Sequence, residues 1–262
     1  MARTLSSYDE ESQLRALRDG GWCAFEEALS PREVRRIESL LHGFIDGLDP
    51  ARLSGFGATI YALAAREPKM NPFYRDLSVL PFLRRALGDA ITLRRTGARI
   101  SGQASQERIL WHHHHGWTGD ELAQRTGFER LLFICYLEGT GSSHGALVIR
   151  PRGFSDPFEE APERLFDPLP GEVQLDYPPG TVVVMDTPVL HSALRGKGDE
   201  LRMICGAHVQ ARSLERAHPE DDPPLDRLRA GARHRSFRWR LRDGRRWLEK
   251  ANQALLPNAN GY

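Results

Sequence analysis

Several features are scarce or missing in this chain of 262 residues. It has no apolar run of 18 or more residues, so a membrane-spanning helix is not expected. Its first residues lack the apolar core of a signal peptide. The formal net charge is only +1, from 36 basic and 35 acidic residues, which does not favour a nucleic-acid or polyanion partner. We therefore expect a globular protein that binds neither membranes nor nucleic acid.

Cysteine is also scarce. Cys23, Cys135 and Cys205 lie far apart in apolar surroundings, and none belongs to a CxxC pair. An odd number of isolated cysteines favours reduced, buried thiols over a disulfide framework or a thiolate metal site. We therefore expect a cytoplasmic protein in which these three residues are small members of the core.

The N-terminal third favours helices. Ser30 and Glu33 have the spacing of a capping box, with a proline at the first helical position between them. Apolar residues then recur at helical spacing. Residues 70–89 predict one or two further helices, which end at Gly88.

After residue 90 the chain changes to short segments rich in β-branched residues and separated by Gly, Pro and Ser. Seven or eight such segments, among them RILWHHH (108–114), GTVVVMD and RMICGAHVQAR, predict a sandwich, jelly roll or barrel. We expect one domain over 1–262. It would have mainly helical support from 1–90, a β core from 91–212 and a helical tail from 213–262.

Four consecutive histidines, at positions 112 to 115, are the most unusual feature. Successive side chains of an extended segment point to opposite faces, so at most alternate histidines can reach one ion. We therefore expect His112 and His114 to point toward a metal, and His113 and His115 to point away from it. A fifth histidine, His191, lies where a buried strand is expected to run into a turn.

Together, His112, His114 and His191 are the kind of residues that form a non-haem iron site. Such a site holds the metal on one face, commonly with two His and one carboxylate, and leaves the opposite face open for cosubstrate and oxygen. Arg202 follows His191 by 11 residues and begins an expected strand. Its guanidinium could form a bidentate pair with the far carboxylate of a metal-bound 2-oxo acid.

Two aspartates are alternative sources of a carboxylate ligand. Asp120 lies in a glycine-containing loop, and Asp186 lies in an expected turn, where capping is the usual role of aspartate. We prefer the three-histidine set. His144 and His208 are expected to be surface or core histidines rather than ligands.

Nearly from end to end, the sequence resembles the phytanoyl-CoA dioxygenase family of Fe(II)- and 2-oxoglutarate-dependent oxygenases. The stretch LRDGGWCAFEEALSPREVRRIESLL resembles the opening strand and helix of the family. ILWHHHHGW falls where the family has Trp followed by His-x-Asp, and HGALVIRPRG is similar to a conserved turn of the family. The most specific match is PPGTVVVMDTPVLHSALRGKGDELR, in which an Arg follows the His by 11 residues.

The resemblance implies a double-stranded β-helix (jelly-roll) core that uses Fe(II), 2-oxoglutarate and O2 to oxidise a C–H bond of a small molecule. By position, His112 would be the first ligand, His191 the distal ligand and Arg202 the 2-oxoglutarate anchor. Trp117 falls where the family has an aromatic residue beside the substrate. The chain departs from the family at His114, which replaces the Asp ligand. Three neutral imidazoles leave one negative charge fewer at the metal, which should raise its reduction potential.

Tyr61, Arg99 and Trp117 are the candidate substrate-binding residues, and they predict an aromatic-lined pocket with an anion contact. The reaction would be hydroxylation, desaturation or ring formation, in secondary metabolism or catabolism. Two alternatives stay open. One is a jelly roll that binds a metal or ligand without catalysis. The other is a three-His dioxygenase that uses no 2-oxoglutarate, in which Arg202 would anchor the carboxylate of the substrate itself.

Overall fold

The computed structural model describes residues 9–45, 57–88, 90–102, 108–114, 122, 124–141, 145–196 and 201–212. The chain divides into two compact units, Met1–Ala232 and Arg233–Tyr262, and all described residues belong to the first unit. The predicted C-terminal helical tail, 213–262, lies outside the described residues, as does Trp117.

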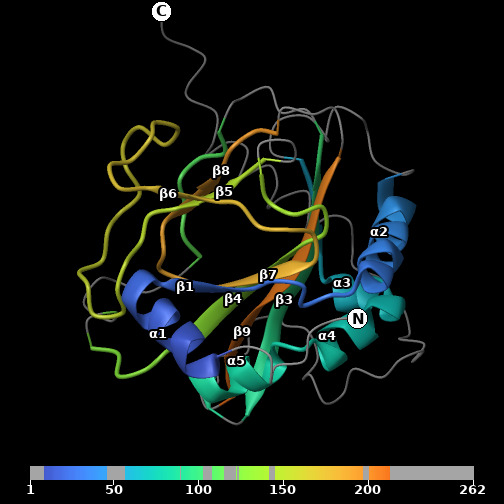
Figure 1. Ribbon diagram of the computed structural model, residues 1–262, viewed down its shortest axis with the longest axis horizontal. Helices are drawn as coiled ribbons and strands as arrows, with labels where there is room; N and C mark the ends of the chain where they lie inside the picture. The colour runs from blue at the N-terminus through green and yellow to red at the C-terminus, as the bar shows by residue number, and fades with distance from the viewer. Residues whose placement is uncertain are drawn as a thin grey trace, which may run out of the picture. The chain divides into compact units, whose positions relative to one another are not determined.

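The described part contains five α-helices, one short 3-10 helix and nine strands (Figure 1). The helices are α1 (Glu10–Gly20), α2 (Pro31–Ile45), α3 (Leu63–Arg66), η3 (Pro68–Met70), α4 (Asn71–Asp76) and α5 (Leu80–Leu87). The strands are β1 (Trp22–Phe25), β2 (Ala58–Tyr61), β3 (Ile91–Ser101), β4 (Arg130–Tyr136), β5 (Leu147–Ile149), β6 (Val173–Leu175), β7 (Thr181–Asp186), β8 (His191–Ala193) and β9 (Arg202–Ala211).

These strands form two antiparallel sheets. The larger has the order β1-β7-β4-β9-β3-β2, and the smaller has the order β6-β5-β8. Apolar side chains from both sheets pack against one another, among them Leu132, Val183 and Met185 from the larger sheet and Leu147 and Leu175 from the smaller. Two facing antiparallel sheets of this kind form the predicted double-stranded β-helix, so the predicted fold class is confirmed.

The helices cover the other face of the larger sheet (Figure 1). The alternation of side chains in a strand sends every second residue to this side. The outward residues of β9 join the helices in one apolar core; they are Met203, Cys205, Ala207 and Val209. All three cysteines are free and buried, as expected. This core fixes the larger sheet and leaves its inner face for the site.

The predicted helix signals are found in the structure. The Ser30 N–H donates to Glu33 Oε2 at 2.8 Å, and the Glu33 N–H donates to Ser30 Oγ at 3.3 Å, which is the reciprocal pattern of a capping box. The described part of residues 70–89 contains two α-helices, α4 and α5, and Gly88, whose φ is 98°, caps the C-terminal end of α5. A positive φ costs glycine little, so a side chain at this position would strain the turn.

Three local predictions need correction. The N-terminal third also supplies β1 and β2, the two edge strands of the larger sheet, and β2 was not expected. Segment 108–114 was expected to be a strand, but it has only isolated bridges, at Arg108 and His112. It is extended, yet its backbone pairs with the sheet at intervals rather than continuously. His191 does not close a strand; it opens the separate strand β8.

Strand β3 contains an irregularity in its pairing with β9. Arg94 pairs with His208 of β9, and the next pair is Gly97 with Gly206, so β3 has one residue more than β9 over this interval. This is a β-bulge, and Arg95 lies within it with φ 51°. Few non-glycine residues adopt such a φ.

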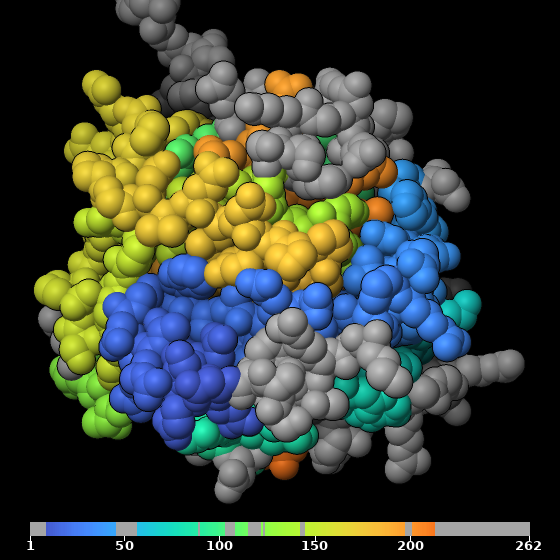
Figure 2. Space-filling model, viewed as in Figure 1, coloured from blue at the N-terminus to red at the C-terminus, as the bar shows by residue number. Residues whose placement is uncertain are grey.

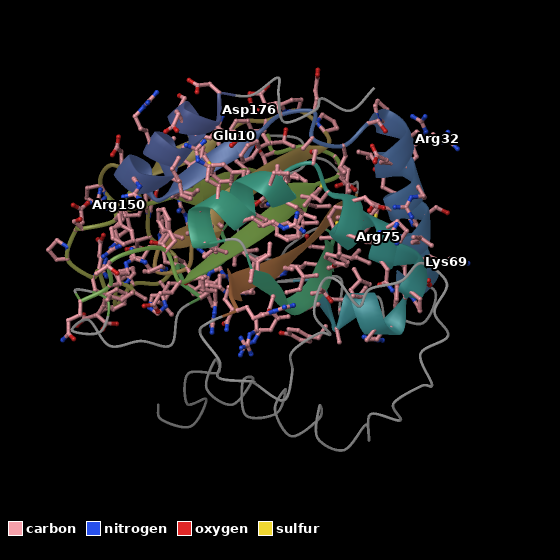
Figure 3. All side chains as sticks on the ribbon, turned by 90° about the horizontal axis from the view of Figure 1, so that it is seen from below. Glu10, Arg32, Lys69, Arg75, Arg150 and Asp176 are labelled. Atoms are coloured by element: carbon pink, nitrogen blue, oxygen red, sulfur yellow. The ribbon has the colours of Figure 1, made fainter. Side chains whose placement is uncertain are left out.

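Segment 150–172 connects β5 to β6 along the outside of α1. In the space-filling view its yellow atoms lie beside the dark blue atoms of α1 (Figure 2). The Arg152 N–H donates to Gly20 O at 3.1 Å, and the Phe154 N–H donates to Arg18 O at 2.7 Å. Charged side chains gather at the periphery, where Figure 3 labels Glu10, Arg32, Lys69, Arg75, Arg150 and Asp176. Within the described ranges, no helix has the length and apolar character to cross a membrane.

Candidate metal centre

The backbone brings the histidines together from two segments that are distant in sequence. The His112 N–H donates to His191 O at 3.1 Å, and the His191 N–H donates back to His112 O at 3.0 Å. The His114 N–H donates to Thr187 O at 2.9 Å. Segment 108–114 therefore runs antiparallel to the start of β8, and residues paired in this way place their side chains on one face.

Side chains of the same segment also hold it in place. Trp111 is fully buried, and its indole N–H donates to Asp167 O at 2.8 Å. Arg108 binds both carboxylate oxygens of Glu172, at 2.7 and 3.1 Å. These contacts hold the extended chain on which His112 and His114 lie.

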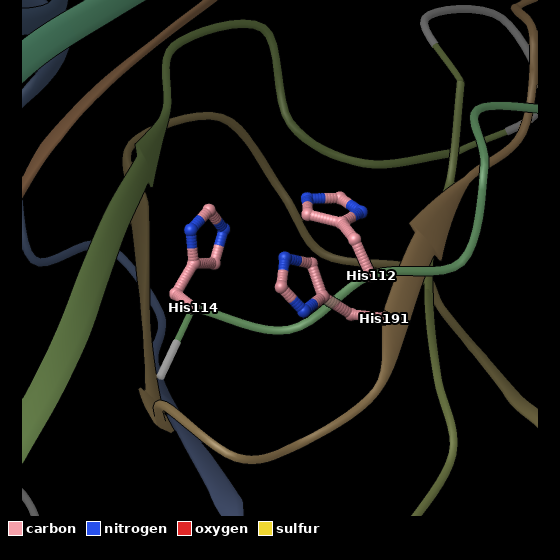
Figure 4. Close-up of side chains that lie close together, drawn as sticks. All are labelled: His112, His114 and His191. Carbon is pink, nitrogen blue, oxygen red and sulfur yellow. The ribbon is translucent and has the colours of Figure 1, made fainter. Parts of the chain in front are cut away.

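Three imidazoles converge in this region (Figure 4). The ring centroid of His191 lies 4.2 Å from that of His112 and 4.9 Å from that of His114, while His112 and His114 are 5.0 Å apart. One ring nitrogen from each residue lies within 4.8 Å of the other two, a spacing that a single ion could bridge. The sequence singled out the same three residues.

Two of the rings have a defined orientation and tautomer. His112 Nδ1 lies 2.9 Å from Leu110 O, and His191 Nδ1 lies 3.1 Å from Val189 O. A carbonyl oxygen can only accept, so each Nδ1 carries the proton and each Nε2 keeps its lone pair. Metal-binding histidines commonly have such a backbone acceptor on the other nitrogen.

Burial also keeps the imidazoles neutral. Desolvation lowers the pKa of His112 to about 4, with a smaller contribution from the positive charge of Arg99. Desolvation is likewise the main cause that lowers the pKa of His114 and of His191 well below the usual value. A neutral imidazole is the form that binds metal, so the donor set fits a divalent transition metal.

Among the described residues, no carboxylate joins this cluster. Asp186 is 2% exposed, and both of its oxygens accept from Arg125, at 3.0 Å for Oδ1. Its side chain is therefore engaged in a buried ion pair. Asp120, the other alternative ligand, lies outside the described residues.

The remaining histidines of the run are placed only in part. The His113 ring lies 5.3 Å from that of Phe158, and His113 does not belong to the three-imidazole cluster. This agrees with the alternation expected of an extended segment. His115 and His144 lie outside the described residues.

Arg202 lies on the inner face of β9, and Arg99 lies on the same face of β3, two residue pairs further along, where it pairs with Ile204. Burial and the positive charge of Arg202 lower the pKa of Arg99 to about 10. The Arg202 guanidinium lies 5.4 Å from the ring centroid of buried Tyr136. Arg202 Nε is buried and has no hydrogen-bond partner in the part of the chain that the structure describes. A carboxylate would satisfy this donor, so the residues fit an anionic cosubstrate.

Tyr61 is half exposed and pairs with Gly97, which places it on the same face as Arg99. Arg99 and Arg202 thus lie at one end of this face, and Tyr61 lies beside them at the level of Gly97. Between this end and His208 lies the pair Gly97 and Gly206, from which no side chain projects. A Cβ on Gly206 would collide with the carbonyl oxygen of Phe133, so this position is closed to other residues.

His208 is a residue that sequence reasoning set aside and that the structure places beside the cluster. Its ring centroid lies 5.0 Å from that of His114, and it is only 8% exposed. Burial lowers its pKa to about 3. The even spacing between Arg202 and His208 within one strand was the available signal, because it places both side chains on the same face.

A comparison with protein-family models finds no match for this sequence, and neither does a comparison with curated proteins. Solved structures do resemble it. The non-haem α-ketoglutarate-dependent carbocyclase SnoK from nogalamycin biosynthesis has a TM-score of 0.65 and 14% identity, over 86% of this chain and 98% of SnoK.

Two further structures are similar at the same level. HygX from Streptomyces hygroscopicus, with nickel and 2-oxoglutarate bound, has a TM-score of 0.62 and 14% identity, over 77% of this chain and 86% of HygX. EctD from S. alaskensis, with 2-oxoglutarate and 5-hydroxyectoine, has a TM-score of 0.60 and 18% identity, over 82% and 85%. At such identities these similarities show the fold.

Proposed function

We propose that this protein is a non-haem Fe(II)- and 2-oxoglutarate-dependent oxygenase, similar to the phytanoyl-CoA dioxygenase family, that oxidises a small molecule. The observation that carries the proposal is the convergence of three neutral imidazoles, of which His191 is buried and His112 and His114 are partly buried. Arg202 lies on the inner face of β9, the face that carries His208 beside the cluster, and its buried Nε has no hydrogen-bond partner among the described residues. The structural neighbours that use the same cosubstrate support this assignment.

Each residue has a distinct task in this proposal. His112, His191 and His114 would hold iron through their ring nitrogens, and their spacing leaves part of the coordination sphere for other ligands. Arg202 would donate hydrogen bonds to the far carboxylate of 2-oxoglutarate. When bound, iron and 2-oxoglutarate would supply the oxidising power, since two of the four electrons that reduce O2 come from 2-oxoglutarate as it becomes succinate and CO2, and two come from the substrate.

The neutral donor set has an electrostatic consequence. A divalent ion held by three imidazoles keeps its full charge of +2, whereas a centre with a carboxylate ligand keeps less. We infer that an anionic cosubstrate binds this centre more strongly than it would bind one with Asp at position 114. Arg99 and Arg202 add positive charge at the end of the face where that anion would lie.

The biological setting follows from the same reasoning and is part of the proposal. The nogalamycin-biosynthesis neighbours support a role in secondary metabolism, with O2 and a small molecule as reactants. The three free, buried cysteines support a cytoplasmic location. Hydroxylation, desaturation and ring formation are all compatible with this site.

The first test is an anaerobic titration. The Fe(II)-loaded protein is titrated with 2-oxoglutarate, and chelation of the metal by the 2-oxo acid should produce a metal-to-ligand charge-transfer band that saturates at one equivalent per site. Succinate, which lacks the 2-oxo group, is the control and should produce no band. A metabolite screen that monitors succinate release would then identify the substrate.

Two results would contradict the proposal in different ways. Retention of iron without a charge-transfer band would favour a three-His dioxygenase that uses no 2-oxoglutarate. Failure to retain any metal after anaerobic reconstitution would favour a non-catalytic jelly roll.

A further inference from the structure

The inner face of β9 has two polar ends. Arg202 lies at one end and His208 at the other, six residues apart, which corresponds to roughly 20 Å along a strand. The charge of Arg99 contributes to the lowered pKa of His112, and the His114 ring contacts that of His208. The histidine cluster therefore lies over the stretch between the two ends. The proposed function uses only the Arg202 end, so the His208 end needs its own explanation.

Arg95 is presented toward this second end by the bulge in β3. The paired residues on either side of the bulge are Arg94 with His208 and Gly97 with Gly206, so Arg95 adjoins the pair that contains His208. Bulges often redirect a side chain beside an active site. The φ of 51° at Arg95 is sparsely populated by non-glycine residues, and such backbone strain is often found at functional positions.

The position of Arg95 in the register places it next to the pair Arg94–His208, and His208 contacts His114. The positive charge of Arg95 is one of the smaller causes that lower the pKa of His114 and of His208. The Arg95 residue is exposed to solvent nevertheless. Arg95 is therefore a solvent-accessible cation beside the strand pair that carries His208.

Two further arginines add to the positive charge here. Arg94 is 6% exposed, and its pKa is lowered by burial and by the charge of Arg95. Burial, Arg94 and Arg95 lower the pKa of Arg130 in the same way. His208 Nδ1 is buried and has no hydrogen-bond partner among the residues that the structure describes. The arginines would attract an oxyanion, and the unsatisfied His208 Nδ1 could form a hydrogen bond with a hydroxyl or amide group attached to that oxyanion.

We propose that Arg95, assisted by His208, binds an oxyanion of the substrate, a carboxylate or a phosphate ester, on the His114 side of the metal centre. This inference rests on the proposed function, because it assigns the substrate of the same site. The substrate would enter at the exposed Arg95 and lie toward the bare Gly97–Gly206 pair. The 2-oxo acid would occupy the Arg202 end.

The test uses Ni(II)-loaded full-length protein saturated with 2-oxoglutarate, so that the Arg202 end is filled and no turnover occurs. Acetate and inorganic phosphate are then titrated separately and followed by calorimetry. We expect one of them to bind at one equivalent, and its identity distinguishes a carboxylate from a phosphate substrate. Arg95→Gln should weaken that binding at least tenfold, and Arg95→Lys should weaken it less. Arg84→Gln removes an equal charge from an exposed position on α5 and should change nothing.

A second variant separates binding from folding. Arg95→Gly suits the positive φ, so it should lose the anion as Arg95→Gln does without lowering Tm. Equal anion affinity in wild type and Arg95→Gln, or no binding of either anion to wild type, would overturn this inference while leaving the charge-transfer test of the oxygenase unaffected. Arg95-dependent anion binding in a protein that gives no charge-transfer band would overturn the proposed function and keep the anion site.

Discussion

Side chains leave strand β9 in two directions, and the two sets differ in character. The outward set is apolar and buried beneath the helices: Met203, Cys205, Ala207 and Val209. The inward set begins with Arg202 and includes His208, which contacts the histidine cluster. The same backbone thus supports the core on one face and the candidate chemistry on the other. Substitutions on the two faces should therefore affect different measurements.

The largest effect is expected away from the metal centre, at the buried ion pair between Arg125 and Asp186, the last residue of β7. Arg125→Met would leave the Asp186 carboxylate, 2% exposed, without its partner. Loss of one member of a buried pair typically costs about 3–5 kcal/mol of unfolding free energy. Chemical denaturation measures this loss. Metal stoichiometry of the folded variant should stay at the wild-type value. A loss of metal would instead support the alternative in which Asp186 is a metal ligand.

Next in size are the histidines themselves. His191→Ala and His114→Ala remove proposed ligands, and we expect metal affinity to fall on the order of 100-fold or more, since loss of a supporting residue alone costs 10–100-fold. His113→Ala is the matched control from the same run and should change affinity little. His114→Asp should keep iron, because it restores a carboxylate ligand. Equal metal loss in His113→Ala and His114→Ala would contradict the alternation described for this segment.

A smaller effect is expected at the cosubstrate end. Arg202→Ala removes the proposed carboxylate partner, and apparent affinity for 2-oxoglutarate should fall more than tenfold, within the roughly 2–5 kcal/mol that loss of such a charged pair costs. Arg202→Lys keeps the charge but loses the bidentate geometry, so its affinity for 2-oxoglutarate should lie between those of the wild type and Arg202→Ala. The charge-transfer titration measures both. Unchanged affinity in Arg202→Ala would exclude the role of anchor.

The smallest effect is expected far from the site. Ser30→Ala removes the side chain of the α2 capping box and should cost about 1 kcal/mol of unfolding free energy, within the usual 0.5–2 for an N-cap. Metal and 2-oxoglutarate binding should be unchanged. Ser30→Thr should retain most of the stability, so a large loss in that variant would point to a cause other than capping.

Local signals made much of this fold predictable. The capping residues Ser30 and Glu33 act within one helical turn, and the run that became β7, TVVVMD, is dense in β-branched residues. Non-local features were not predictable. The short edge strand β2 and the bulge at Arg95 depend on how β3 pairs with β2 and β9, which no spacing in a single segment reveals. His208 was set aside because its proximity to His114 arises from the approach of segment 108–114 to strand β9.

The reciprocal hydrogen bonds between His112 and His191 bear on the entropy of metal uptake. These bonds and the Nδ1 contacts to Leu110 O and Val189 O fix two rings through the protein's own structure. An ion that enters such a site has few dihedral angles left to order, so its binding energy goes into affinity rather than into folding the chain. Chelators should therefore remove the metal from a chain that stays folded, unlike small zinc domains that unfold on metal loss.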